Sequence, residues 1–296
     1  MKKTLTLWCT VALLLLVFTA CKQQPQKLLL AGSGWNKLVI IDKQSKQIEW
    51  AYPLDASWEC NSATATPDGN ILFAYRKGAR VISRDKKTLW DIPAPDGCEM
   101  QTVRVLPDGN YLLAWCGHPA KIMEVNPKGE ILSETEYETG IDNPHAQFRQ
   151  VNKNKVGNYL MPLFETSEVR EITPEGKLAG TTKLEGTPFS TVLLNNGNYM
   201  VACGDGHSLM EVDFDNGKIV RKIGVNDIEG VSLFFVAQLL PVSNGNLYIC
   251  NWQGHDPNAK ATNNPQLMEI DKHNKVVWSL NDNDTFGMIS SISTID

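Results

Sequence analysis

The chain has 296 residues, of which 42% are hydrophobic and 21% charged, and its formal net charge is −5. A chain of this length can bury one substantial core. It contains no basic run and no interleaving of basic and aromatic residues, so the composition excludes the usual signature of a nucleic-acid-binding protein.

Residues 1–20 are predicted to be a signal peptide. Lys2 and Lys3 precede an apolar stretch, residues 5–18, that is too short to span a bilayer comfortably. The segment ends in Phe18-Thr19-Ala20-Cys21, which resembles the lipobox of bacterial lipoproteins. In that family the signal is cut before the cysteine, and the attached lipid holds the protein to a membrane. The alternative is an ordinary secretory peptide cut near Ala20.

Residues 21–27 are predicted to be a polar tether, followed by the folded domain at 28–296. The tether has no acidic residue. Some bacterial groups mark surface lipoproteins with acidic residues after the lipidated cysteine, so we expect an envelope protein on the periplasmic side.

A turn motif recurs along the folded domain. It appears as Pro67-Asp68-Gly69-Asn70 and again near Gly109, Gly157, Gly197 and Gly245, at intervals of 40 or 48 residues. Asp-Gly and Asn-Gly favour the positive φ of a hairpin turn. A period of 40 to 50 residues with several short strands indicates the blades of a β-propeller.

A second motif also recurs along the folded domain. It is an apolar strand with a glutamate in four of its five copies, at 38–42, 122–126, 169–173, 209–213 and 267–271. Three of the strands that come next contain a tryptophan, namely Trp50, Trp90 and Trp278. Features that recur in several blades serve the blade, so we expect these tryptophans and Glu124, Glu171, Glu211 and Glu269 to be structural.

The strand count predicts an all-β, six-bladed propeller with four antiparallel strands per blade. Five complete sets span 59–95, 98–137, 145–185, 188–223 and 234–281. Three N-terminal strands, at 28–31, 38–41 and 48–52, and one C-terminal strand at 288–294 remain. We expect them to form the sixth blade together, because joining the termini removes open sheet edges.

The candidate site lies on the face that carries the varied loops. With strands lettered A to D outward from the axis, the A–B and C–D turns share one face, and the B–C and D–A loops share the other. The varied loops contain four of the five histidines. The candidate ligand-binding residues are Trp58, Glu59, Glu99, Arg104, Trp115, His118, His145, Arg149, His207, Trp252 and His255.

Three interpretations of this face remain open from the residues. It is a hydrated polar channel mouth without a ligand, a pocket for a small molecule or glycan, or a metal site. The histidines have no compact HxH or HExxH spacing, so we expect no metal.

The five cysteines of the folded domain show no zinc or thioredoxin spacing. Cys116, Cys203 and Cys250 are expected to be buried hydrophobic residues. Cys60 and Cys98 are the candidate disulfide pair.

The repeats resemble two groups of propellers. One is the quinoprotein-like (PQQ-repeat-like) proteins, many of which are envelope lipoproteins. The other is the bacterial arylsulfotransferases, in which histidines and an arginine at the channel mouth are catalytic. Quinone-dependent dehydrogenases generally have eight blades and a vicinal cysteine pair, and this chain has neither, so we expect no cofactor. No position of the sulfotransferase motif can be matched residue by residue.

The sequence therefore predicts a membrane-anchored binding or interaction module whose ligand is a small molecule, a glycan or a protein. The alternative is an enzyme with a His/Glu/Arg site, either sulfotransferase-like or glycan-degrading. A histidine within hydrogen-bond reach of Glu59, Glu99 or an arginine would favour chemistry.

Overall fold

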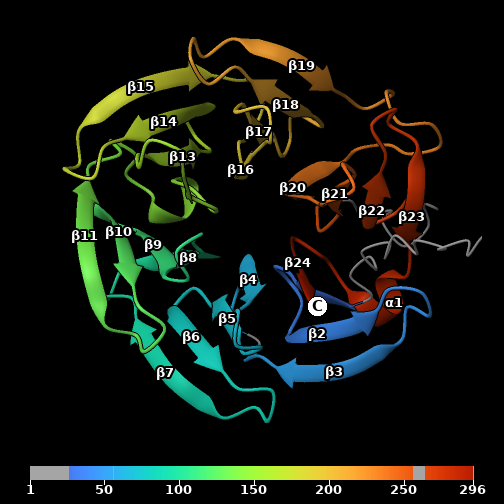
Figure 1. Cartoon of the computed structure of the whole chain (residues 1–296), viewed down its shortest axis with the longest axis horizontal. Coiled ribbons are helices and arrows are strands. Elements are labelled where there is room, and N and C mark those ends of the chain that lie inside the picture. The colour runs from blue at the N-terminus through green and yellow to red at the C-terminus, as the bar shows by residue number, and fades with distance from the viewer. Residues whose placement is uncertain (1–26, 56, 256–263, 296) are drawn as a thin grey trace, which may run out of the picture.

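Six four-stranded antiparallel sheets form a ring, as Figure 1 shows. The structure, a computed structural model, describes residues 27–55, 57–255 and 264–295. The predicted six-bladed propeller is confirmed. The expected signal peptide, Cys21 and most of the tether lie outside the described residues.

Five blades are continuous in sequence. Blade 1 contains β4 (Ser62–Ala65), β5 (Ile71–Ala74), β6 (Gly78–Ile82) and β7 (Thr88–Pro93). Blade 2 contains β8 (Glu99–Val105), β9 (Tyr111–Cys116), β10 (Ala120–Val125) and β11 (Ile131–Tyr137). Blade 3 contains β12 (Asn152–Lys153), β13 (Tyr159–Leu163), β14 (Glu168–Ile172) and β15 (Leu178–Lys183). Blade 4 contains β16 (Ser190–Leu193), β17 (Tyr199–Ala202), β18 (Leu209–Val212) and β19 (Ile219–Ile223). Blade 5 contains β20 (Phe235–Pro241), β21 (Leu247–Trp252), β22 (Leu267–Ile270) and β23 (Val276–Leu280).

The sixth blade joins the two ends of the chain, as predicted. Its strands, from the axis outward, are β24 (Ser291–Ile295), β1 (Lys27–Ala31), β2 (Lys37–Asp42) and β3 (Ile48–Pro53). Leu28 pairs with Thr294 and Leu30 pairs with Ile292. In Figure 1 the red β24 lies beside the blue N-terminal strands. The inner strand begins at Ser291, later than the expected position 288.

A short helix precedes that inner strand. Helix α1 (Asn283–Phe286) is capped by Asp282, whose carboxylate accepts a hydrogen bond from the Thr285 amide. The other described helix is the 3₁₀ turn η1 (Pro144–Ala146). Within the described ranges, neither has the length or the apolar character needed to cross a membrane.

The repeated glutamates are structural, as expected. Glu171, Glu211 and Glu269 each accept hydrogen bonds from asparagine side chains of the A–B turn of their own blade. Glu124 instead accepts from Lys153 and the Tyr159 hydroxyl of the next blade. These carboxylates hold turns or neighbouring blades in place.

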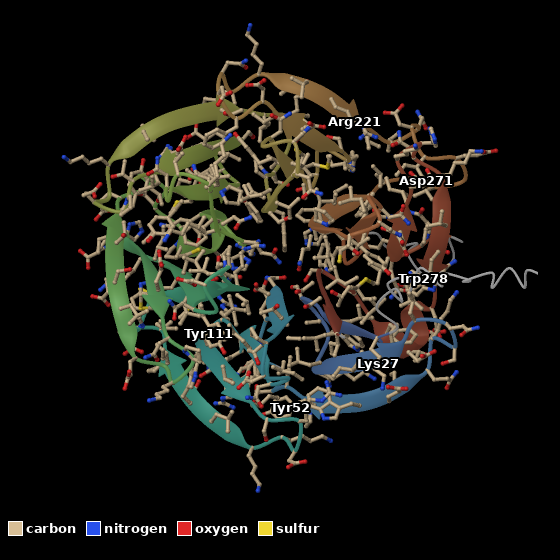
Figure 2. All side chains as sticks on the ribbon, in the orientation of Figure 1. Lys27, Tyr52, Tyr111, Arg221, Asp271 and Trp278 are labelled. Atoms are coloured by element: carbon tan, nitrogen blue, oxygen red, sulfur yellow. The ribbon has the colours of Figure 1, made fainter. Side chains whose placement is uncertain are left out.

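The repeated tryptophans join neighbouring blades, which confirms the packing role predicted for them. The indole N–H groups of Trp50, Trp90 and Trp278 donate to backbone oxygens of Arg84, Pro127 and Lys43, respectively. Each acceptor lies in the next blade of the ring. Trp278, labelled in Figure 2, makes this bond between blade 5 and the sixth blade.

Polar side chains also bridge the inner strands around the axis. Ser291 contacts Ala63, Ser62 contacts Val103, Thr102 contacts Arg149, Asn152 contacts Thr191, Ser190 contacts Ala237 and Gln238 contacts Ile292. In each case a side chain bonds to a backbone group, so buried main-chain polar atoms at blade boundaries are satisfied.

A glutamine reaches across the centre of this ring. Gln150 is 1% exposed, and its amide nitrogen donates to Asn61 O at 2.7 Å and to Gln238 Oε1 at 3.0 Å. It therefore joins blades 1, 3 and 5. Below we call the end of the ring with the A–B and C–D turns the turn face, and the other end the loop face.

All five cysteines of the folded domain are free. The candidate Cys60–Cys98 disulfide is therefore wrong. Cys60 is buried in a hydrophobic cluster with Leu54 and Tyr75, and burial raises the pKa of its thiol to about 12. Cys116, Cys203 and Cys250 are buried, as predicted.

Candidate functional site

The loop face contains a cavity of about 420 Å³ beside the ring axis, called here the loop-face pocket. Its described lining residues come from B–C and D–A loops and the adjoining strand ends. The lining residues are Ser33, Glu59, Asn61, Asn143, His145, Ala146, Arg149, Phe164, Glu165, Thr187, Phe189, Asp205, Phe235, Trp252, His255 and Ser290. A cavity of this size can hold a small molecule.

A hydrogen-bonded chain of three residues forms the polar side of the pocket. Nδ1 of His145 lies 2.7 Å from Oε2 of Glu99, and Nε2 lies 3.0 Å from Nη2 of Arg149. A guanidinium can only donate, so His145 Nε2 accepts and the ring proton lies on Nδ1, from which it is donated to Glu99. Arg149 also donates to two backbone oxygens, those of His145 and Phe148.

Glu99 is almost buried beneath His145 and is held from the other side by Arg76. Arg76 donates to its Oε1 at 2.6 and 3.0 Å, and Gln101 donates to its Oε2 at 3.1 Å. Burial alone would raise the pKa of Glu99. The hydrogen bond from His145 and the bonds and charge of Arg76 outweigh burial and lower this pKa to about 2. Glu99 is therefore ionised and orients His145.

Glu59 presents the other carboxylate of the polar side. Its Oε1 accepts hydrogen bonds from Asn61 at 2.6 Å and Ser33 at 3.2 Å, and Arg149 Nε lies 3.8 Å away. Its Oε2 is 3.9 Å from His145 Nδ1, beyond hydrogen-bond distance. The side chain is only 16% exposed, so Oε2 is a nearly buried acceptor that a ligand can use.

A row of aromatic rings also lines the pocket. Phe164, Phe189, Phe235 and Trp252 follow one another at centroid distances of 6.0, 5.7 and 5.5 Å. His255 packs edge-on against Trp252 at 4.7 Å. The rings come from blades 3, 4 and 5, so packing between blades creates this surface.

Two exposed carboxylates stand at the rim. Glu165 follows Phe164 in the B–C loop of blade 3, and Asp205 lies in the equivalent loop of blade 4. Asp205 is positioned by Thr187, whose hydroxyl accepts from the Asp205 amide at 2.8 Å. Among the described residues, neither carboxylate is ion-paired with a lysine or an arginine.

A second hollow adjoins the first and shares Ser33 and Glu59 with it. It is lined by Trp35, Trp58 and Arg76, among others. Trp58 packs against Tyr75 with a centroid distance of 4.2 Å and an interplanar angle of 33°, and it lies under Arg80. Glu59 is thus accessible from both hollows.

The structure brings many of the predicted site residues together. Glu59, His145, Arg149, Trp252 and His255 line the loop-face pocket, Glu99 lies directly beneath it and Trp58 lines the adjoining hollow. From the sequence, a histidine within hydrogen-bond reach of a glutamate or an arginine is the sign that would favour chemistry. His145 meets this condition, because it hydrogen-bonds both Glu99 and Arg149.

Three other predicted residues lie on the same face but outside both hollows. Trp115 is 8% exposed and packs against Lys121. His118 contacts the backbone oxygen of Asp142 at 2.8 Å, and His207 contacts that of Phe234.

Arg104 differs from the expectation, because it lies at the opposite opening. It lines a turn-face hollow of about 390 Å³ together with residues of the A–B turns such as Pro107 and Asn195. Its guanidinium donates to the backbone oxygens of Val151 and Thr191 at 3.4 Å, and burial lowers its pKa to about 10.

Sequence reasoning predicted Trp252 but missed Arg76 and the three phenylalanines of the aromatic row. Phe164, Phe189 and Phe235 stand at strand ends, where an apolar residue is usually part of the core. Arg76 occupies a tight B–C turn with φ of 63°. Arg76 lies in the same set of varied loops as the histidines, and this position could have marked it as a candidate site residue.

No group of three or more histidine, cysteine, aspartate or glutamate side chains in the described part of the chain could hold a metal ion. Both ring nitrogens of His145 are already engaged in contacts with side chains. The arrangement fits recognition of an organic ligand by hydrogen bonds and aromatic contacts.

Comparisons with known proteins agree on the fold. The protein-family model described as Mal s 1 allergenic protein-like matches residues 27–275 of this chain. The crystal structure of a protein of unknown function from Bacteroides caccae is 62% identical, with a TM-score of 0.90 over 92% of this chain and 99% of that chain. Streptogramin B lyase is 15% identical, with a TM-score of 0.62 over 92% of this chain and 84% of the other.

Virginiamycin B lyase from Staphylococcus aureus is 14% identical, with a TM-score of 0.60 over 86% of this chain and 80% of that one. At such identities the two lyases share the fold alone. No curated protein matches this sequence.

Proposed function

The chain belongs to the Mal s 1 allergenic protein-like family, and we propose that it is a lipid-anchored envelope protein that binds a small molecule in the loop-face pocket. The observation that carries this proposal is the prearranged polar side of the pocket. His145 and Arg149 are fixed by each other, by Glu99 and by the backbone, while Glu59 Oε2 has no hydrogen-bond partner among the described residues. A site that needs no rearrangement loses less entropy when it binds.

The same geometry favours binding over general-base catalysis by His145. A general base needs a free lone pair directed at the substrate. The lone pair of His145 Nε2 accepts a hydrogen bond from Arg149, so the histidine cannot take a proton unless Arg149 moves.

A second candidate function is an enzyme in which Glu59 takes the proton. The free Glu59 Oε2 next to His145 and Arg149 is the observation in its favour. Solved structures with this fold include lyases, and one is a catalytically inactive histidine-to-alanine variant of virginiamycin B lyase with quinupristin. A sulfotransferase-like or glycan-degrading reaction would belong to this second candidate.

The proposed anchor is compatible with an accessible pocket. Lys27, the first residue of β1, pairs with Asp42 beside the C–D turn, and Ala31 at the other end of β1 lies beside Ser290. The chain therefore enters the propeller at the turn face. A lipid on Cys21 would hold the turn face towards the membrane and leave the loop-face pocket open to the periplasm.

Retention of small molecules tests the proposal. The purified protein is incubated with a polar small-molecule extract of bacterial cells, separated by size exclusion and analysed by native mass spectrometry. Glu165→Trp places an indole at the rim of the pocket, whereas Val156→Trp places one at a position 63% exposed on the turn face. Wild type and Val156→Trp should retain a compound that Glu165→Trp loses. Equal retention by all three, or retention by none, would contradict the proposal.

A further inference from the structure

The charges around the loop-face pocket do not balance. Its lining contains three carboxylates, Glu59, Glu165 and Asp205, and one guanidinium, Arg149. With His145 and His255 neutral, the described lining has a formal charge of −2. The nearby carboxylate of Glu99 does not change this sum, because Arg76 is paired with it. An excess of one sign of charge in a concave site attracts ligands of the opposite sign.

The positive charge of Arg149 is already counted in this sum, and its hydrogen-bonding groups are engaged by the protein. Both of its terminal nitrogens donate to protein acceptors, two backbone oxygens and His145 Nε2. Its nearest approach to Glu59 is 3.8 Å. Arg149 therefore offsets the charge of Glu59 only in part, and among the described residues the rim carboxylates of Glu165 and Asp205 have no ion-pairing cation.

The aromatic row faces the same cavity. The π face of an aromatic ring is electronegative and attracts a cation within about 6 Å of the ring centroid. Phe164 already makes a cation–π contact of this kind, since the guanidinium carbon of Arg149 lies 4.6 Å from its ring centroid. Phe189, Phe235 and Trp252 continue the row and line the pocket together with Asp205.

From these features we infer that the ligand of the loop-face pocket carries a positively charged ammonium group on a small, partly apolar body. The inference rests on the proposed binding function and specifies its ligand class. The ammonium group lies between the aromatic row and the carboxylates. Glu59 Oε2 accepts a hydrogen bond from the ligand where the ligand has an N–H or O–H to donate.

A pair of isosteric probes tests the charge directly. Choline and 3,3-dimethylbutan-1-ol have the same shape, but only choline has the positive charge. In isothermal titration calorimetry, choline should bind saturably and about tenfold or more tightly than the alcohol, because only a cation gains from the ring faces and the carboxylates. Equal affinity for the two probes would overturn the inference.

Variants locate the effect. Asp205→Asn keeps the shape and removes one charge, and it should weaken choline binding about fivefold. Phe235→Leu should weaken it as well, with the melting temperature checked because Phe235 is buried. Glu138→Gln, an exposed carboxylate of the same face outside the pocket, is the matched control and should leave choline binding unchanged. Choline binding that is insensitive to Asp205→Asn would contradict the inference.

The outcomes also separate this inference from the function on which it rests. If choline fails to bind while the extract experiment yields a neutral or anionic compound lost in Glu165→Trp, the cation inference is wrong and the binding function stands. If the extract experiment also yields nothing, both fail.

Discussion

Glu99 Oε2 and His145 Nδ1 lie 2.7 Å apart although they belong to neighbouring blades, with Glu99 in β8 and His145 in η1 before blade 3. The bond fixes the tautomer of the histidine and, through Nε2, the position of Arg149. The geometry of the pocket therefore depends on how two blades pack.

The Glu99 carboxylate should make the stability of the fold depend on pH. Its pKa is lowered from 4.5 to about 2, so its contribution is present above about pH 4.5 and is lost as the pH falls towards 2. Glu99→Gln should therefore destabilise the protein at pH 6, and the difference from wild type should shrink at pH 3. Urea denaturation at the two pH values measures this. A difference that is equal at both, or no larger than that of the exposed control Glu138→Gln, would show that the ionised carboxylate does not stabilise the fold.

The sixth blade should control the stability of the whole ring. Deleting residues 287–296 removes β24 and exposes the edges of β1 and the core beside β4. The truncated protein should melt at a clearly lower temperature or fail to fold. An unchanged melting temperature would argue against a shared closing blade.

A single substitution tests the same blade more gently. Ile292 is 1% exposed, so Ile292→Ala should cost about 2–5 kcal/mol in the free energy of unfolding. Val277 on an outer strand is 52% exposed, and Val277→Ala should change it by less than about 0.5 kcal/mol. Similar costs for both would mean that β24 does not pack as part of the core.

The architecture could be read from the sequence because its signals are local. Asp-Gly and Asn-Gly turns require positive φ, and Gly109 has φ of 85° and Gly197 of 91°. The spacing of these turns predicted where each blade begins and ends. The four strands left over at the two ends of the chain predicted the shared sixth blade. The structural roles of Trp278 and Glu269 followed from repetition alone.

The site could be read only in part, because it depends on register and on contacts between blades. Arg104 and Arg149 occupy different positions in their repeats, because Arg104 lies five residues before its turn glycine Gly109 and Arg149 lies eight before Gly157. Arg104 pairs with Leu112 as Asn152 pairs with Leu160 in blade 3, so Asn152 is its equivalent there. The inner strand of blade 3 begins only after Arg149, at Asn152. Arg149 thus stays on the loop face, while Arg104 lies at the far end of its strand.

The glutamine that crosses the ring axis should matter more than its uncharged side chain suggests. Gln150→Leu leaves the backbone oxygen of Asn61 without its donor and removes the bond to Gln238, which should cost about 1–3 kcal/mol. Gln47→Leu, at an exposed position, is the control. Urea denaturation compares them, and an equal, small effect of both would refute a structural role for the crossing.

The proposed lipid anchor gives a separate prediction. Wild-type protein expressed in a bacterial host with its signal peptide should enter the detergent phase in a phase-separation assay, since acyl chains on the cysteine confer membrane affinity. Cys21→Ser should remain in the aqueous phase. Identical partitioning of the two proteins would rule out the lipoprotein interpretation.

The most direct test of the binding function is a crystal structure of the protein with the compound that it retains from the cell extract. We predict density for the compound in the loop-face pocket, in contact with Glu59 and the aromatic row that contains Phe235 and Trp252. Density in the turn-face hollow beside Arg104, or an empty loop-face pocket with the compound bound elsewhere, would contradict it.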